Sequence, residues 1–185
     1  TAKERSRALA TDLATQLART EGGPWYRRIS LPDEAPLKTY QLKLHPFVAS
    51  IQEHFNAGGA LVEYVEGDDV SRAVHVVGNY WEAIRRLLPD AFAEPGDYSL
   101  QRTPGVYSLH MLLPEVLRLC EQDSDATVKK MATVLDHVEL LKLADAWSNK
   151  EKEKANPLTL GTNMRLIRML RDEMRMDLPR PRIAL

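Results

Sequence analysis

The sequence predicts an all-α fold, a compact bundle of about six helices with short loops and one short extended segment near residues 38–44. Three observations support this prediction. Apolar residues recur three or four positions apart in most long stretches, which is the period of a helix with one buried face. Glycine and proline stand where these stretches begin and end. Outside residues 38–44, no stretch alternates apolar and polar residues as a half-buried strand does.

The composition is that of a globular protein. The chain has 185 residues, of which 44% are hydrophobic and 28% charged, enough to bury one core. We expect a single helical domain over residues 1–178, followed by a tail over residues 179–185 that contains proline and arginine. No apolar run reaches the ~20 residues that cross a bilayer, and no basic-then-apolar leader is present. These features predict a cytoplasmic protein with no membrane contact.

The first two helices are each predicted by an apolar stripe and a glycine stop. The first covers residues 3–20 and ends before Gly22. The second opens at Pro46, because proline suits the first helical position, and ends before Gly58. Between them, residues 39–44 alternate and permit a short strand, for which we expect no partner. The stripes consist of Leu9, Leu13 and Leu17, and of Phe47, Val48, Ile51 and Phe55.

The third and fourth helices have the longest apolar seams. The third covers residues 70–88, and Pro89 ends it. The fourth begins at Thr103, which is expected to cap it. Pro114 falls inside its apolar pattern, so a kink or break is expected near Met111. The seams consist of Val70, Val74, Val77, Trp81, Ile84 and Leu88, and of Leu109, Leu113, Val116 and Cys120, with Leu112 and Leu117 beside them.

The C-terminal part of the chain predicts two more helices. A fifth helix is expected after a cap at Ser124 or Asp125, and it continues to Leu141. The last helix runs from about Gly161 to Met176, and the prolines beyond it end the ordered structure. The single cysteine, Cys120, lies on an apolar helical register and is predicted to be a buried side chain without catalytic use. The fifth helix buries Val128, Met131, Leu135, Val138 and Leu141.

The sequence predicts no reaction centre, cofactor or metal site. The five histidines stand singly, and the densest polar cluster, residues 136–139, lacks the cysteines that a zinc deaminase would add. No Gly-x-Ser-x-Gly elbow and no phosphate-binding glycine loop is present. Gly161 precedes a helix start whose free amides could hold one phosphate, but that signal is weak alone. Only an acid or histidine cluster formed in three dimensions would favour an enzyme.

The strongest candidate contact surface is the last helix. Its arginines are three or four positions apart, share one side, and can neutralise the backbone phosphates of double-stranded DNA. Charge along the chain allows nucleic acid to approach only the ends, because residues 45–139 carry 15 acidic and 7 basic groups whereas residues 140–185 carry 6 and 10. The favoured interpretation of this pattern is that the basic ends lie against the acidic centre within one fold. Alternatively, the acidic residues of this helix, among them Asp172 and Glu173, pair with the arginines and leave an ordinary exposed face. The candidate nucleic-acid-binding residues are Arg165, Arg168, Arg171 and Arg175.

Several short segments follow one another along most of the chain. They are the apolar stretch 8–17, GPWYRRI at 23–29, YWEAI at 80–84, LQRTPGV at 100–106 leading into Leu109 and Leu112-Leu113, Ala146-Trp147, and GTNM at 161–164. Their order resembles the C-terminal half of DGQHR-domain proteins, bacterial proteins linked to DNA phosphorothioate modification and related defence islands. The Asp-Gly-Gln-His-Arg motif itself does not occur here, and it belongs to an N-terminal part resembling the ParB/sulfiredoxin fold. The resemblance therefore implies a helical portion without the family's conserved site.

Two functions of different class follow. The first is a non-catalytic helical domain of a bacterial DNA-modification or defence protein that contributes to DNA association. Its further partner would be an N-terminal catalytic or binding half, or a separate protein. The second is a helical protein-interaction or oligomerisation module with no nucleic-acid contact, in which the seam over residues 70–88 or the patch at Leu112 and Leu113 contacts a partner. The spacing of both apolar rows favours an ordinary core instead.

Overall fold

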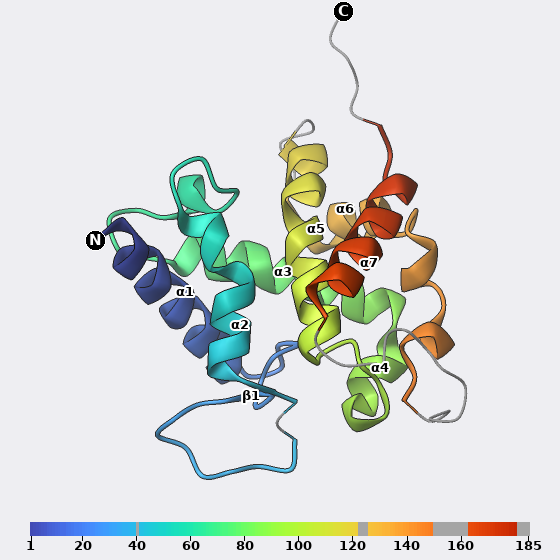
Figure 1. Ribbon diagram of the computed structural model, residues 1–185, viewed down its shortest axis with the longest axis horizontal. Helices are drawn as coiled ribbons and strands as arrows, with labels where there is room; N and C mark the ends of the chain where they lie inside the picture. The colour runs from blue at the N-terminus through green and yellow to red at the C-terminus, as the bar shows by residue number, and fades with distance from the viewer. Residues whose placement is uncertain (40, 122–125, 150–162, 181–185) are drawn as a thin grey trace, which may run out of the picture.

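The computed structural model describes residues 1–39, 41–121, 126–149 and 163–180, and in this part of the chain it confirms the predicted all-α fold class (Figure 1). In Figure 1, α1 and α2 lie at the left end of the molecule, and α5 and α7 lie toward the right. The helices are α1 (Ala2–Arg19), α2 (Leu44–Ile51), α3 (Ser71–Leu87), α4 (Pro89–Ala93), α5 (Thr103–Glu121), α6 (Val128–Leu135) and α7 (Met164–Asp177). Short 3-10 turns are η1 (Gln52–Phe55), η2 (Val62–Tyr64), η3 (Pro95–Asp97), η4 (Glu139–Leu141) and η5 (Ala144–Trp147).

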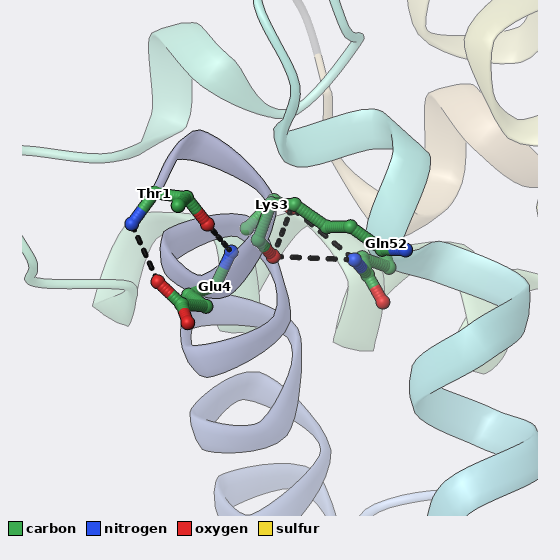
Figure 2. Close-up of polar contacts among 5 residues, drawn as sticks. Thr1, Lys3, Glu4 and Gln52 are labelled. Carbon is green, nitrogen blue, oxygen red and sulfur yellow. Dashed lines mark hydrogen bonds and ion pairs between the residues drawn. The ribbon is translucent and has the colours of Figure 1, made fainter.

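The start of α1 is fixed by a capping box. The Thr1 hydroxyl accepts a hydrogen bond from the Glu4 amide at 3.3 Å, and the Glu4 carboxylate accepts one from the Thr1 backbone nitrogen. Figure 2 shows this pair beside Gln52, whose side-chain amide donates to the Lys3 carbonyl at 3.4 Å. The same amide donates to the Ser6 hydroxyl at 3.3 Å. The first turn of α1 is thereby tied to η1.

The core is one contiguous cluster of buried apolar side chains in which α3 and α5 are central. Helix α3 packs against α1 and α6, while α5 packs against α2, α6 and α7. Three fully buried tryptophans, Trp25, Trp81 and Trp147, anchor the cluster. The Trp25 ring meets Trp81 edge to face at 4.8 Å between centroids and Phe47 at 5.0 Å. Cys120 is buried, as predicted.

The extended segment has a partner, which corrects the expectation of a lone strand. Strand β2 (Leu42–Lys43) pairs in parallel with β1 (Ile29–Ser30), and Ile29 lies opposite Leu42. Both side chains are buried in the core. Strand β2 lies in the alternating stretch 39–44, whereas β1 has only two residues, too few to show the alternation by which a strand is recognised in a sequence.

The helix boundaries agree only in part with the prediction, and the second helix is shorter than expected, because α2 spans Leu44–Ile51 and is followed by η1. Helix α5 continues past Pro114 to Glu121, so of the kink or break expected near Met111, a break does not occur. The fifth predicted helix ends early: α6 stops at Leu135, and η4 and η5 follow it. Its cap is Thr127, whose hydroxyl accepts from the Lys130 amide at 3.2 Å, while the expected caps at 124 and 125 lie outside the described residues. Pro89 ends α3 as expected but also opens α4.

In the part of the chain that the structure describes, no helix combines the length and the apolar character that a membrane span needs.

Helix α7 begins at Met164, where the Asn163 side chain accepts from the Arg165 amide at 2.9 Å. The predicted start at Gly161 lies outside the described residues. The Asn163 side chain therefore fixes where the arginine-bearing helix begins.

Candidate binding surface along the last helix

Helix α7 lies between α5 and the η4–η5 segment (Figure 1). Toward α5, the Arg175 Nε lies 3.3 Å from Glu115 Oε1. Toward η4, the Asp177 carboxylate accepts a hydrogen bond from the Glu139 amide at 3.0 Å. The helix thus presents arginine to α5 and a carboxylate to η4. Its buried face consists of Ile167, Leu170 and Met174.

Two of the four predicted arginines are engaged within the fold. Arg171 forms an ion pair with its neighbour Asp172, and Arg175 pairs with α5 as described above. Arg165 and Arg168 are exposed and make no ion pair with another described residue. Exposed pairs contribute little to stability, about 0–1 kcal/mol. Among the described residues, no carboxylate forms an ion pair with the arginines in the N-terminal half of α7.

Three exposed methionines lie on the same helix, and the sequence analysis missed them. Met164, Met169 and Met176 are 37%, 59% and 86% exposed. Methionine and arginine are both enriched in protein interfaces, and the flexible thioether adapts to irregular partners. A helical wheel would have found Met169 and Met176, because they fall on the side opposite Ile167 and Met174, whereas Met164 lies three residues before Ile167 and borders that buried face. Their exposure favours a protein contact on α7.

A groove of about 370 Å³ lies where the C-terminal ends of α5 and α7 meet. Two arginines of its lining share one carboxylate. Arg118 approaches Glu115 Oε2 at 3.2 Å, while Arg175 approaches Oε1 of the same side chain. Arg180 adds a third guanidinium to the lining. The apolar lining consists of Leu119, Met176, Leu178 and Pro179.

The two apolar rows considered as docking surfaces belong to the core. Val77 and Trp81, in the middle of the seam over residues 70–88, have no exposed surface. Leu112 and Leu113 are also fully buried. These rows stabilise the fold itself and are not available to a partner.

Two buried side chains from other helices, Ser50 and Trp81, contact the ring of His110 in α5. Ser50 Oγ lies 2.7 Å from His110 Nδ1, and the Trp81 indole donates to His110 Nε2 at 3.1 Å. Because the indole is only a donor, Nε2 is the acceptor, and Nδ1 of the neutral imidazole carries the proton. That proton points to Ser50, whose hydroxyl donates onward to the Phe47 carbonyl at 2.6 Å. All three donors are satisfied.

This Ser–His pair is arranged as a structural element. A nucleophilic serine needs a histidine that accepts its proton, whereas His110 donates to Ser50. Burial, with a smaller effect of His54, lowers the pKa of His110 well below its ordinary value, so the ring is neutral. Both side chains are buried, with Ser50 4% exposed and His110 0%. The pair therefore holds α2, α3 and α5 together.

Pro114 explains a second set of buried contacts. It has no amide proton for the carbonyl four residues earlier, which belongs to His110. His54 Nε2 donates to that carbonyl at 2.8 Å, and the Tyr80 hydroxyl donates to the neighbouring Leu109 carbonyl at 2.8 Å. Two side chains from other elements thus satisfy the carbonyls beside the proline, which allows α5 to continue. Histidines that stand singly in the sequence meet here in space.

No metal site is formed in the described ranges, where no three histidine, cysteine or acidic side chains come together. The polar cluster at residues 136–139 is a surface turn in which Asp136, His137 and Glu139 are exposed around the buried Val138. Its side chains face solvent, as expected of a polar helix end.

Comparisons with protein-family models, with curated proteins and with solved structures found no match to this chain. The segment order that resembles DGQHR-domain proteins therefore stands on the segments alone. Inference about function depends on the surfaces described above.

Proposed function

We propose that this chain is a non-catalytic helical domain of a bacterial, cytoplasmic DNA-modification or defence protein, and that it contributes to association with double-stranded DNA. The observation that carries the proposal is the pair Arg165 and Arg168, which is exposed and has no ion pair within the described residues. One turn apart, the two guanidinium groups can reach neighbouring phosphates of one strand. The segment order that resembles DGQHR-domain proteins supports the same class.

The contact we propose is with the phosphate backbone. Asp172 and Glu173 are exposed on α7 among the arginines, and carboxylates there oppose insertion of the helix between the negatively charged strands. Arginines at the edge of the helix can still neutralise phosphates, which positions a protein on DNA without reading its sequence. Binding is therefore expected to depend on salt and to tolerate changes of DNA sequence.

Substituting Arg165→Glu and Arg168→Glu together tests the site. Fluorescence anisotropy with a labelled duplex should show wild-type binding that weakens about tenfold between about 50 and 200 mM salt, as expected for two phosphate contacts. The double variant should bind more weakly, with a slope against log salt reduced by about 2.

A matched control separates the site from net charge. Arg7 and Arg19 are exposed on α1 and distant from α7 (Figure 1). Arg7→Glu with Arg19→Glu changes the net charge by the same amount and should leave DNA binding nearly unchanged. Equal loss in both double variants would show that the effect belongs to net charge and not to α7.

The interaction module built on residues 70–88 or on Leu112 and Leu113 is not proposed, because these rows are buried in the core. A protein contact would have to use another surface. The exposed methionines and the groove at the end of α7 supply one.

A further inference from the structure

We infer a second binding site in the groove between the C-terminal ends of α5 and α7, which takes an acidic and apolar peptide segment of a partner protein. The site is separate from the proposed DNA contact. That contact uses Arg165 and Arg168 in the first half of α7, whereas the groove is lined by residues from Arg175 onward and by the end of α5.

The charge of the groove calls for an anionic partner. Three guanidinium groups, those of Arg118, Arg175 and Arg180, line it together with one carboxylate, Glu115. Glu115 already accepts from Arg118 at 3.2 Å and lies 3.3 Å from Arg175. Arg180 is exposed and makes no ion pair with a described residue. The groove therefore keeps an excess of positive charge that its own carboxylate does not balance.

The shared carboxylate also holds the guanidinium groups in place. A guanidinium has five N–H donors, and the contacts of Arg118 and Arg175 with Glu115 use only part of them. The remaining donors can bind a second carboxylate in the two-pronged geometry that arginine favours. Because Glu115 already orients both side chains, a partner loses less conformational entropy when it binds them.

The apolar lining distinguishes a peptide from a nucleic acid. Met176 is 86% exposed, and Leu119, Leu178 and Pro179 line the groove with it. A phosphate backbone offers no apolar group to cover these side chains, whereas a leucine, methionine or phenylalanine of a peptide does. The volume of about 370 Å³ suits a short segment with one large apolar side chain and flanking carboxylates.

Another hollow, of about 510 Å³ between α1 and α3, lacks this excess of charge. Two of its polar side chains bind within the protein: Arg85 donates to the Gly22 carbonyl at 3.0 Å and pairs with Glu82, and Asn79 donates to the Ala126 carbonyl at 3.1 Å. Trp25, which also lines the hollow, has a buried Nε1 with no hydrogen-bond partner among the described residues, and this single N–H donor suits a neutral acceptor. The excess of guanidinium groups that an acidic segment needs is found in the groove on α7.

Selection of short random peptides displayed on phage tests the inference. The bait is the full chain, and the counter-bait is a Met176→Ser, Arg180→Glu variant, whose changes lie on exposed positions and should not disturb folding. Enriched peptides should combine Asp or Glu with Leu, Ile, Met or Phe. A selected peptide should bind the variant at least about tenfold more weakly, and should lose binding when its acidic residues become Asn and Gln.

The two proposals can fail independently. Arg165→Glu with Arg168→Glu should weaken DNA binding and retain the peptide, whereas Met176→Ser alone should weaken the peptide and retain DNA. The groove is overturned if no peptides are enriched, if the enriched peptides lack acidic residues, or if they bind wild type and the groove variant equally. Circular dichroism on each variant confirms that the helices are intact.

Discussion

Two glycines inside helices, Gly78 in α3 and Gly105 in α5, differ in how much space surrounds the position of a Cβ atom. A Cβ added at Gly78 would meet only Leu17 Cδ2, at 3.7 Å, which is an ordinary contact. A Cβ at Gly105 would press on the backbone of Leu100, including its carbonyl, closer than real Cβ atoms come. Gly105 is therefore required by the close approach of two backbones, and Gly78 is not.

Alanine at these two positions should consequently have opposite effects. Gly78→Ala should raise the free energy of unfolding by about 0.5–1 kcal/mol, because alanine loses less backbone entropy in a helix. Gly105→Ala should lower it by about 1–3 kcal/mol, the usual cost of overpacking. Urea denaturation of both variants measures the difference. A Gly105→Ala protein as stable as the wild type would show that Leu100 can move aside without cost.

At the scale of the element, α5 shows how a helix tolerates an internal proline. Pro114 removes the amide that would bond to the His110 carbonyl. His54 donates to this carbonyl from η1, and Tyr80 donates to the Leu109 carbonyl from α3. The sequence predicts a kink or a break because the proline is visible in it, whereas the two donors come from 56 and 29 residues away. Only the folded chain brings them together.

A double-mutant cycle tests this compensation. His54→Leu leaves the buried His110 carbonyl without its donor and should cost about 1–3 kcal/mol. In a Pro114→Ala background the Ala amide can bond to the same carbonyl, so the cost of His54→Leu should fall by about 1 kcal/mol. Free energies of unfolding of the four proteins give the coupling. If His54→Leu costs the same in both backgrounds, the His54 contact is independent of the proline.

Across the whole molecule, the sequence predicts the faces of individual helices, because these repeat along the chain. It does not predict the contacts between elements that are distant in the sequence. Val77, Trp81 and Ile84 have no exposed surface, as their spacing predicts, because periodicity reports burial directly. The arginine side of α7 follows from the same rule. The pairing of Arg175 with Glu115 does not, because its partner belongs to another helix.

Four segments that are far apart in the sequence, around Trp25, Trp81, Gln101 and Trp147, meet in this core. Trp25 packs on Trp81, and the Gln101 side-chain amide donates to the Pro24 carbonyl at 2.8 Å. The amide of Ser99, beside Leu100, donates to the Trp147 carbonyl at 2.8 Å. Segments far apart in the chain thus pack on one another. They determine the fold, whereas the surfaces proposed for binding lie on α5 and α7.

The buried histidines make the stability of the whole molecule depend on pH. Burial lowers the pKa of His54, and burial together with His54 lowers that of His110, from an ordinary value of 6.5. Below that value the unfolded chain binds protons that the folded chain does not. Below pH 6.5, each histidine can therefore lower the free energy of unfolding by up to about 1.4 kcal/mol for each pH unit. The folded chain is most stable with respect to these two histidines above about pH 6.5, where both rings are neutral in the folded and the unfolded chain. Stability is lost as the pH falls from there toward the pKa values of the folded chain.

Glu121 acts in the opposite direction, because burial, followed by the nearby Glu63, raises its pKa. The contribution of Glu121 to the free energy of unfolding is lost as the pH rises through that raised pKa. The effect is small, because the side chain is exposed and solvent screens it. The histidines should dominate, and the free energy of unfolding in urea should fall by about 1–2 kcal/mol between about pH 7.5 and 5.5. His54→Leu should reduce this loss to about half, whereas substitution of the exposed His137 by Asn should leave it unchanged. Equal stability at both pH values would mean that the folded chain can protonate both rings, and hence that the contacts of His110 with Trp81 and Ser50 open readily.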